Sequence, residues 1–386
     1  MASDPSPYAI RVDRGSAVAD DPGTSIIILV TKDTTMLRRC LRTVAAAGSP
    51  DDRSEVIVVA NGTSEGALAA VESRQDIVLI RSPVNHGFAG GCNLAVRCAR
   101  GERLVFLNDD AAVTPGWLGG LHRALDADRY TAVAGSKVLL REDRLQEAGC
   151  VLWRDGRTSG VGRGRLPREQ EFSFSRPVDY VSFCSAMVRR EAWTEADGFD
   201  ERYFPAYYED VDLCLALRQL GWGITYEATS VVLHSEGGSA TPDYRAFLSR
   251  RNHAAFVAKW ASVLHEYDPP PVTEADRRGS VQRALRRSAE RPLPSRTTAS
   301  GTQRALPALD AFDDLESLAL DVRHLLAAMD ITGEYIEHLQ AEASRVGIRD
   351  VVRRRLRRRL VQFRERVDNR GRPEGTVTDA VDGTSM

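Results

Sequence analysis

Short β-branched runs alternate with stretches of helical apolar spacing in the N-terminal part of the chain. "TSIIILV" at 24–30 and "SEVIVVA" at 54–60 predict strands, and "MLRRCLRTVAAAG" between them has the spacing of a helix that glycine ends. "DIVLIRS" at 76–82 and "RLVFLNDD" at 103–110 predict two further strands around the helical "CNLAVRCARG". Nearly continuous apolar strands separated by helices indicate a parallel sheet covered on both faces. Ligands of such sheets bind beyond the carboxyl ends of the strands.

Composition divides the 386 residues into segments. We expect a flexible polar lead-in over 1–23 and one catalytic domain over 24–265. Residues 266–311 are rich in Pro, Arg and Ser and have little to bury, which predicts a linker. Apolar residues at spacings of three and four then predict a helical extension over 312–366, followed by a disordered tail over 367–386.

Charge and cysteine usage exclude several classes of protein. The formal net charge of -2 gives no overall bias toward nucleic acid. The six cysteines lack CxxC spacing, which argues against a disulfide framework and a structural metal site and favours a reducing cytoplasm. The first residues lack the basic and apolar regions of a signal peptide, and no run reaches the roughly eighteen apolar residues of a membrane span, so we expect neither secretion nor a transmembrane anchor.

The C-terminal segments predict surface contacts. Residues 348–366 place arginines around a row of apolar residues, a pattern typical of a helix that binds an anionic membrane surface; the alternative is a solvated helix paired with acids elsewhere in the chain. No nucleic-acid-binding motif accompanies this charge. The helix expected around 312–340 would either pair with a second copy, forming a homo-oligomer, or fold back on the catalytic domain.

An acidic group follows the strand that begins at residue 103. "FLNDDAAVTPGWL" places Asn108, Asp109 and Asp110 after the apolar residues of this strand. Mg²⁺ prefers oxygen ligands and is commonly held by one or two carboxylates together with substrate phosphates. These side chains therefore predict a metal site, and the alternative is that they only cap the following turn.

Three other motifs carry polar or glycine residues where a ligand could bind. "NHGFAGGCNLAV" at 85–96 opens a helix with glycines and suits an anion or a flat ring, although a glycine-rich loop without a ligand explains it equally well. In "YYEDVDLCLALRQLGW" we expect Asp212 to cap a helix, while Glu209 and Asp210 lie outside it and could serve as a general base. His234 ends the strand "SVVLH" and is either structural or a metal ligand.

Together these motifs resemble the inverting family 2 glycosyltransferases, which have the GT-A fold. The similarity runs from about residue 24 to 262, and it is closest to the bacterial branch that contains rhamnosyltransferases. Its segments occur in the family's order and spacing: "SIIILVTKDTTMLRRCLRTV", "EVIVVANGTSEG", "NHGFAGGCNLAV", "RLVFLNDDAAVTPGWL", "GFDERYFPAYYEDVDLCLALRQLGW" and "VVLHSEGGS". The resemblance implies an α/β, Rossmann-like mixed sheet, mostly parallel and flanked by helices, to which this chain adds a C-terminal α-helical extension.

The resemblance also implies roles for individual residues. Asp110, with Asn108 and Asp109, matches the element that binds Mg²⁺ or Mn²⁺ on the nucleotide diphosphate, and His234 matches the histidine that completes the metal site. Asp210 matches the catalytic base, with Glu209 positioning the acceptor or the base. The remaining matches belong to the nucleoside pocket and the donor-binding turn: Thr31, Asp33, Asn61, Asn85, Gly87, Phe88 and Asn93.

Two departures from the family pattern leave the nucleotide open. Ala60 stands where the family commonly has an acid that contacts the nucleobase or ribose, and "TKD" replaces the usual "TYN" after the first strand. "YVSFCSAMVRR" also places Phe183 where the family commonly has glycine, which would reshape the acceptor pocket.

The resemblance implies a metal-dependent inverting transfer of sugar from a nucleotide-diphosphate donor, dTDP-rhamnose or a UDP-sugar, to a hydroxyl of a glycan or lipid-linked acceptor. Such an enzyme of cell-surface polysaccharide biosynthesis would be cytoplasmic, with contact to the inner face of the membrane through 348–366. Two alternatives stay open. One is a sugar-1-phosphate nucleotidyltransferase, which the motif "YYEDVDL" disfavours. The other is a non-catalytic transferase-like scaffold, which the substitution at Ala60 keeps open and the presence of Asp110, Asp210 and His234 disfavours.

Overall fold

The computed structural model describes residues 10–31, 34–48, 53–63, 68, 71–140, 143–235 and 242–290. The chain divides into two units, 1–303 and 304–386, and the second lies outside the described residues. The predictions of a helical extension over 312–366 and of a tail over 367–386 therefore concern residues that the structure does not describe. No helix within the described ranges is long and apolar enough to cross a bilayer.

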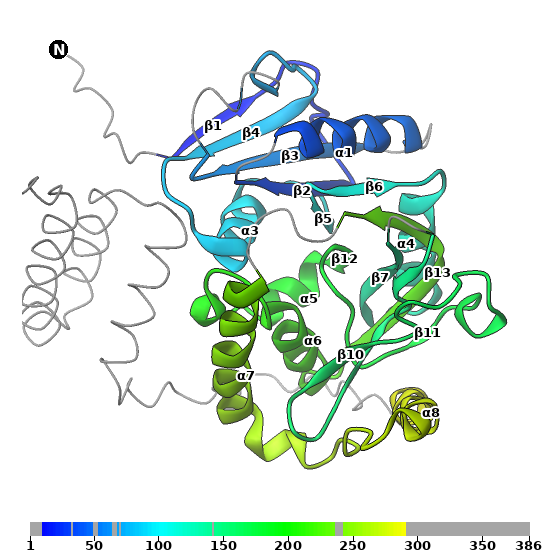
Figure 1. Cartoon of the computed structure of the whole chain (residues 1–386). Coiled ribbons are helices and arrows are strands. Elements are labelled where there is room, and N and C mark those ends of the chain that lie inside the picture. Colours follow the sequence, from blue (N-terminus) through cyan, green and yellow to red (C-terminus); the bar gives the residue numbers. More distant parts are fainter. Residues whose placement is uncertain are drawn as a thin grey trace, which may run out of the picture. The chain divides into compact units, whose positions relative to one another are not determined.

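Four parallel strands form one half of the sheet, in the spatial order β4-β3-β2-β5 (Figure 1). They are β2 (Thr24–Val30), β3 (Ser54–Asn61), β4 (Ile77–Ser82) and β5 (Arg103–Asn108). Helix α1 (Thr34–Ala47) follows β2, and α3 (Gly87–Cys98) connects β4 to β5. The βαβ units predicted from the sequence are confirmed, because helices connect strands that pair in parallel. The carboxyl ends of these four strands therefore lie at one edge of the sheet.

Antiparallel pairs extend the sheet beyond β5. β12 (Ser185–Arg189) pairs antiparallel with both β5 and β7 (Thr131–Leu139), and β13 (Gly223–His234) runs parallel to β7. Three shorter strands join the sheet: β6 (Ala111–Val113) and β11 (Arg176–Pro177) pair with β13, and β8 (Leu145–Glu147) pairs with β7. β9 (Cys150–Leu152) and β10 (Thr158–Gly160) form a separate hairpin. The mixed sheet agrees with the predicted α/β class.

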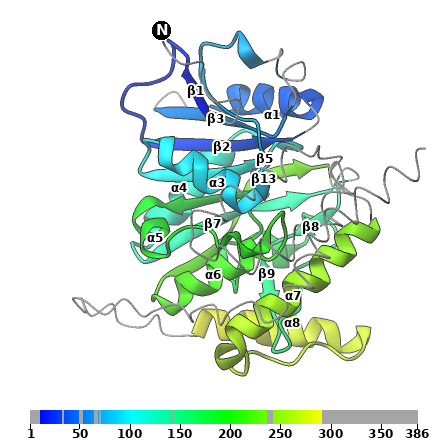
Figure 2. The same cartoon turned by 90° about the vertical axis from the view of Figure 1, so that its left-hand side faces the viewer.

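Helices cover both faces of the sheet (Figures 1 and 2). Alternate side chains of β2 enter separate cores: Ile26 and Ile28 pack with α1 and α4 (Trp117–Ala127), whereas Ile27 belongs to the core that contains α3 residues. This division follows from the strand period of two. The core that contains Ile27 also includes side chains of α5 (Arg190–Glu195), α6 (Glu209–Gln219) and α7 (Pro242–Leu264). Two short 3-10 turns, η1 (Gln170–Phe172) and η2 (Glu201–Tyr203), lie between strands and helices.

The predicted lead-in differs from the structure in its second half. Residues Arg11–Arg14 form β1, an edge strand antiparallel to β4. Arg14 places a guanidinium nitrogen 2.7 Å from a carboxylate oxygen of Glu55, whose side chain is fully buried. A short polar edge strand has no apolar run to reveal it, because its ladder bonds and ion pairs hold it in place.

The predicted linker is wrong over 274–290, which form helix α8 (Glu274–Glu290). Ala284 and Ser288 of this helix are buried, and the Ser288 hydroxyl donates to an Asp179 carboxylate oxygen at 2.7 Å. Arg287 forms an ion pair with the same carboxylate at 2.6 Å. The helix is therefore attached by small residues and polar bonds together with the partly buried Val281 and Leu285, a pattern too weak to stand out in the sequence. Residues 291–311 lie outside the described ranges.

Candidate active site

Asp110 and His234 meet at the carboxyl edge of the sheet although 124 positions separate them in the sequence. Pairing of β13 with β6 brings His234 opposite Ala111, and the imidazole Nε2 lies 3.0 Å from Asp110 Oδ1. The Asn108 amide nitrogen lies 3.3 Å from the same Nε2. On the other side of the ring, His234 Nδ1 lies 2.7 Å from the Gln146 Oε1 and donates to it. The structure thus brings together three of the predicted metal-site residues.

This group of side chains suits a hard divalent cation. Asp110 Oδ1 is buried beside His234 Nε2, and a carboxylate oxygen with a neutral imidazole nitrogen is a donor set that Mg²⁺ and Mn²⁺ accept. Burial opposes protonation of His234, yet Cys184 and the Asp110 carboxylate raise the pKa of this histidine to about 11, so His234 and Asp110 form an ion pair, and a metal cation would bind in place of the imidazolium proton. The site therefore favours positive charge. No cluster of three His, Cys, Asp or Glu side chains with ligand geometry occurs among the described residues, so phosphate and water oxygens would have to complete the shell.

The predicted donor turn is built around the Asn61 side chain. Asn61 is 1% exposed, and its amide nitrogen donates to the Asn85 Oδ1 at 3.1 Å and to the Gly87 carbonyl at 2.9 Å. Its Oδ1 accepts the backbone N–H of His86 at 2.8 Å. Asn85 Oδ1 also accepts the Gly87 N–H at 2.8 Å. The side-chain amides of Asn61 and Asn85 therefore hold the backbone of the turn in place. The sequence did not distinguish this structural role from direct contact with a nucleoside.

The other predicted nucleotide residues are less defined by their contacts. Thr31 follows β2 directly and is half-buried, and Asp109 is half-buried after β5. Asp33 lies outside the described residues. Ala60, which replaces the acid of the family pattern, is 1% exposed within β3.

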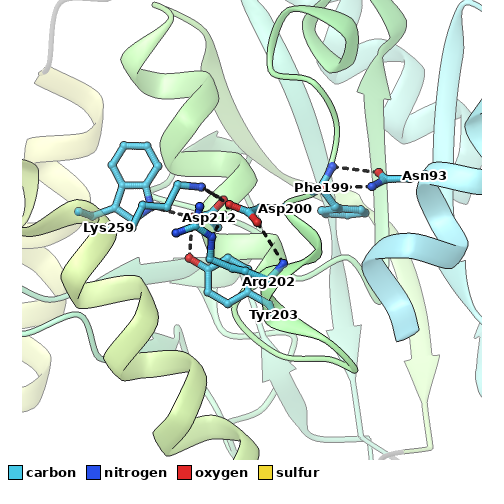
Figure 3. A network of polar contacts seen from close by, with 8 residues as sticks. Asn93, Phe199, Asp200, Arg202, Tyr203, Asp212 and Lys259 are labelled. Carbon is cyan, nitrogen blue, oxygen red and sulfur yellow. Dashed lines mark hydrogen bonds and ion pairs between the residues drawn. The ribbon is translucent and has the colours of Figure 1, made fainter. Parts of the chain in front are cut away.

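Asn93 of α3 is fully engaged with the segment that precedes α6 (Figure 3). Its amide nitrogen donates to the Phe199 carbonyl and to a Glu201 carboxylate oxygen, both at 2.9 Å, and its Oδ1 accepts the Phe199 N–H at 3.0 Å. Asn93 thus ties the donor-side helix to the acidic segment. Nothing in this arrangement leaves its amide free for a donor sugar.

Glu209 and Asp210 form the first turn of α6. The sequence placed them outside the helix, but α6 begins at Glu209 and its preceding residue Tyr208 gives no side-chain cap. Asp210 Oδ1 accepts the backbone N–H of Val211 at 2.8 Å, yet burial raises the pKa of the Asp210 carboxyl to about 6. Burial and the neighbouring Asp210 charge raise the pKa of Glu209, whose Oε2 is buried and accepts no hydrogen bond.

Asp212 does not cap α6 as expected from the sequence. Its carboxylate is buried inside the molecule, where Oδ1 accepts the Tyr203 hydroxyl at 2.8 Å and the Trp260 indole N–H at 2.7 Å. Lys259 Nζ donates to Asp212 Oδ2 at 2.7 Å and to Asp200 Oδ2 at 2.8 Å (Figure 3). Asp212 therefore joins α6 to α7 and to the segment that precedes α6, so it has a structural role that differs from the role expected of Glu209 and Asp210.

A buried carboxyl that the sequence did not reveal, Glu147, lies within electrostatic range of His234 in the candidate metal site and of Asp210 in α6. Glu147 of β8 accepts the Ser182 N–H at 3.3 Å. Burial raises the pKa of Glu147 to about 7, with a further increase from the Asp210 charge and a decrease from His234, so this carboxyl lies within electrostatic range of both. "LQEAGC" reads as an ordinary short strand, and the topology alone brings Gln146 and Glu147 to the site.

The aromatic side chains at positions 183, 193 and 207 divide into buried and exposed ones. Trp193 is 6% exposed and stacks on Phe106 with ring centroids 4.8 Å apart, so it belongs to the core. Phe183 is also buried, against Phe106 and Phe199. Tyr207 is 36% exposed, two residues before Glu209.

A mixed α/β sheet with acids and a histidine at its carboxyl edge defines the GT-A class of fold. A crystal structure of GalNAc-T7 with UDP, GalNAc and Mn2+ superimposes with a TM-score of 0.52 over 64% of this chain and 49% of that chain, at 14% identity. The sequence profile of "Glycosyl transferase family 2" matches residues 25–194. Rhamnosyltransferase WbbL of Escherichia coli is 32% identical over 235 residues, 54% of this chain and 86% of that protein.

The chain therefore belongs to glycosyl transferase family 2, and the predicted rhamnosyltransferase-like branch is confirmed. The N-acetylglucosaminyl-diphospho-decaprenol L-rhamnosyltransferase of Mycobacterium tuberculosis is 27% identical over 231 residues, which are 52% of this chain and 73% of that protein. The chain spans only 28% and 19% of the length of two further relatives, one of them an O-antigen biosynthesis protein of Myxococcus xanthus.

Proposed function

We propose that this chain is a metal-dependent inverting glycosyltransferase that moves a sugar from a nucleotide-diphosphate donor, dTDP-rhamnose or a UDP-sugar, to a hydroxyl of a glycan or lipid-linked acceptor. The observation that carries the proposal is the pair formed by Asp110 Oδ1 and His234 Nε2, 3.0 Å apart at the carboxyl edge of the sheet. This pair supports the cation site of the proposal. The buried carboxyl of Asp210, whose pKa is raised to about 6, supports the proposed base.

Asp110 and His234 would hold Mg²⁺ or Mn²⁺, with Asn108 and Asp109 beside them. The bound metal supplies charge that offsets the departing diphosphate. On the donor side, the turn from Asn85 to Phe88 leads into α3 and would line the donor site, while Thr31 and Asp33 would contact the nucleoside. Asn61 and Asn93 would support the donor site indirectly, because their amides hydrogen-bond to the protein's own backbone.

Asp210 accepts the proton of the acceptor hydroxyl as that oxygen attacks the anomeric carbon from the face opposite the diphosphate. A pKa of about 6 leaves this carboxyl ionised near neutral pH and more basic than an ordinary aspartate, which suits a general base. The raised pKa of Glu209 favours its protonated form, so Glu209 would donate a hydrogen bond to the acceptor or to Asp210. One displacement inverts the anomeric centre without a covalent intermediate.

The acceptor class is supported by the relatives. One relative is named for transfer of L-rhamnose onto an N-acetylglucosaminyl-diphospho-decaprenol, and another for O-antigen biosynthesis. We therefore propose a role in cell-surface polysaccharide assembly on the cytoplasmic side of the membrane. The basic segment 348–366 would then contact anionic lipid, and 312–340 would carry any homo-oligomer contact; both lie outside the described residues.

Two measurements test this function. Thermal stabilisation by UDP, dTDP, GDP and CDP, each with and without Mn²⁺ or Mg²⁺, identifies the nucleotide, because a ligand that binds the folded state raises its apparent stability. NMR of the product formed from the preferred donor then reports the anomeric configuration. A metal-dependent shift with inversion supports the proposal, whereas the absence of a shift with every nucleotide would favour the scaffold alternative.

A further inference from the structure

The segment from Tyr203 to Tyr208 runs directly into the acids of α6 and has an unusual backbone. Tyr207 and Tyr208 both have a φ of +78°, in the left-handed region that non-glycine residues rarely adopt. Such a conformation persists only where the surrounding structure determines it. The next residues are Glu209 and Asp210, so the direction in which both carboxyls enter the site depends on this backbone.

One side chain of α7 bonds to most of this segment. Asn252 is fully buried, and its amide nitrogen donates to the carbonyls of Tyr203 at 3.1 Å, Ala206 at 2.9 Å and Tyr207 at 2.8 Å. Its Oδ1 accepts Arg251 Nε at 2.9 Å, and the Arg251 guanidinium also bonds the Phe204 carbonyl. The amide therefore joins both ends of the turn through bonds made by a side chain that is fully buried.

The same face of α7 continues the attachment. Phe256, one helical turn after Asn252, packs against the Tyr208 ring with centroids 5.3 Å apart. Lys259, two turns after Asn252, bonds Asp200 and Asp212, which lie on either side of the turn in the sequence. Helix α7 thus contacts the acidic segment before, within and after its left-handed residues.

We propose that Asn252 is a positioning residue for sugar transfer: it fixes the backbone of 203–207 and thereby the direction of Glu209 and Asp210. The proposal rests on the function proposed above, because it assigns Asp210 as the base. A displacement of about 1 Å can cost roughly 100-fold in rate even when every catalytic group is present. Helix α7 also lies outside residues 25–194, the part of the chain that the family profile matches.

Asn252→Leu removes both N–H donors at similar volume, and Asn252→Asp keeps the shape but turns a carboxylate toward three carbonyls. The matched control is Arg250→Ala, two residues earlier on α7 and exposed. We expect both Asn252 variants to lower kcat by about 100-fold. The Kd of the preferred nucleotide with Mn²⁺ should change much less than kcat does, since Asn252 reaches the donor turn only through the segment 203–207. Backbone amides of 203–212 should exchange with deuterium at least about tenfold faster, while those of β5 keep their rate.

Three outcomes would overturn the proposal. One is a kcat within about threefold of wild type in a folded Asn252 variant. The second is an exchange rate of 203–212 that the substitutions leave unchanged. The third is a fall in melting temperature with no change in kcat, which would make Asn252 a stabilising residue only. If neither variant folds, exchange in the wild-type chain decides: amides of 204 and 206–208 that exchange as fast as those of an unfolded chain would show that this turn is not held. Exchange and nucleotide binding need no sugar transfer, so they judge Asn252 even if the proposed function fails.

Discussion

Replacement of Lys259 by methionine should destabilise the protein through the carboxylates it leaves behind. The Lys259 side chain is 2% exposed, and Asp212, at 2.7 Å, is 3% exposed. Asp200 is less affected, because Arg202 remains 2.7 Å from its carboxylate and it is 22% exposed. Removing one partner of a buried pair costs about 3–5 kcal/mol. Since Asp212 keeps its bonds to Tyr203 and Trp260, we expect about 3 kcal/mol, or roughly 6–12 °C in melting temperature.

The loss should depend on pH with a definite sign. Burial already raises the pKa of Asp212 although Lys259 and its other partners lower it, and without Lys259 that pKa rises further. A carboxyl whose pKa is higher in the folded than in the unfolded state destabilises the fold as pH increases through the folded value. The stability deficit of Lys259→Met should therefore be smaller near about pH 5 than near about pH 8.

Guanidinium unfolding at both pH values measures these differences. The double variant Lys259→Met/Asp212→Leu should lose less stability than Lys259→Met alone at the higher pH, because no isolated charge remains. Arg250→Ala, exposed on the same helix, is the control. A deficit below about 1 kcal/mol for Lys259→Met, or one that is equal at both pH values, would refute the argument that an unpaired buried carboxylate is the cause.

Three further predictions concern the candidate site. Asp210→Asn should lower transfer at least about 100-fold while nucleotide binding is kept, measured by nucleotide release; comparable loss of both would contradict its role as base. Because burial raises the pKa of Asp210 to about 6 and the base must be ionised, kcat should increase with pH through about 6 and then level off, and a flat acid limb would contradict this. Asp110→Asn and His234→Ala should each abolish the Mn²⁺-dependent part of the thermal shift given by the preferred nucleotide, and a retained metal effect would place the cation elsewhere.

The βαβ half of the fold was predictable because β2 to β5 bury both faces, so their apolar runs stand out from the helices between them. β1 and α8 were not, since β1 is polar and at an edge, and α8 is attached through Ala284, Arg287 and Ser288. Their attachment depends on partners distant in the sequence, Glu55 and Asp179, which composition does not reveal.

Residue type identified the polar members of the site but not the direction in which they point. Asn61 and Asn93 are where the family pattern puts them, yet their amides bind the protein's own backbone. Asp212 belongs to the same acidic triplet as Glu209 and Asp210, but two positions along the helix, about 200°, turn it away from Asp210 and toward Lys259. Glu147 and Gln146 reach the site only through the pairing of β8 with β7.

The donor turn and the acidic segment share a backbone hydrogen bond, from the Phe88 N–H to the Pro205 carbonyl at 2.7 Å. A Cβ on Gly87 would lie 2.7 Å from the same carbonyl, so the two segments touch without room for a side chain. For protein engineering, this means that the turn proposed to bind the donor is not an exchangeable module. A graft that brings in 85–88 from a relative has to bring that relative's counterpart of 203–208 with it, or the graft also displaces Asp210, the proposed base.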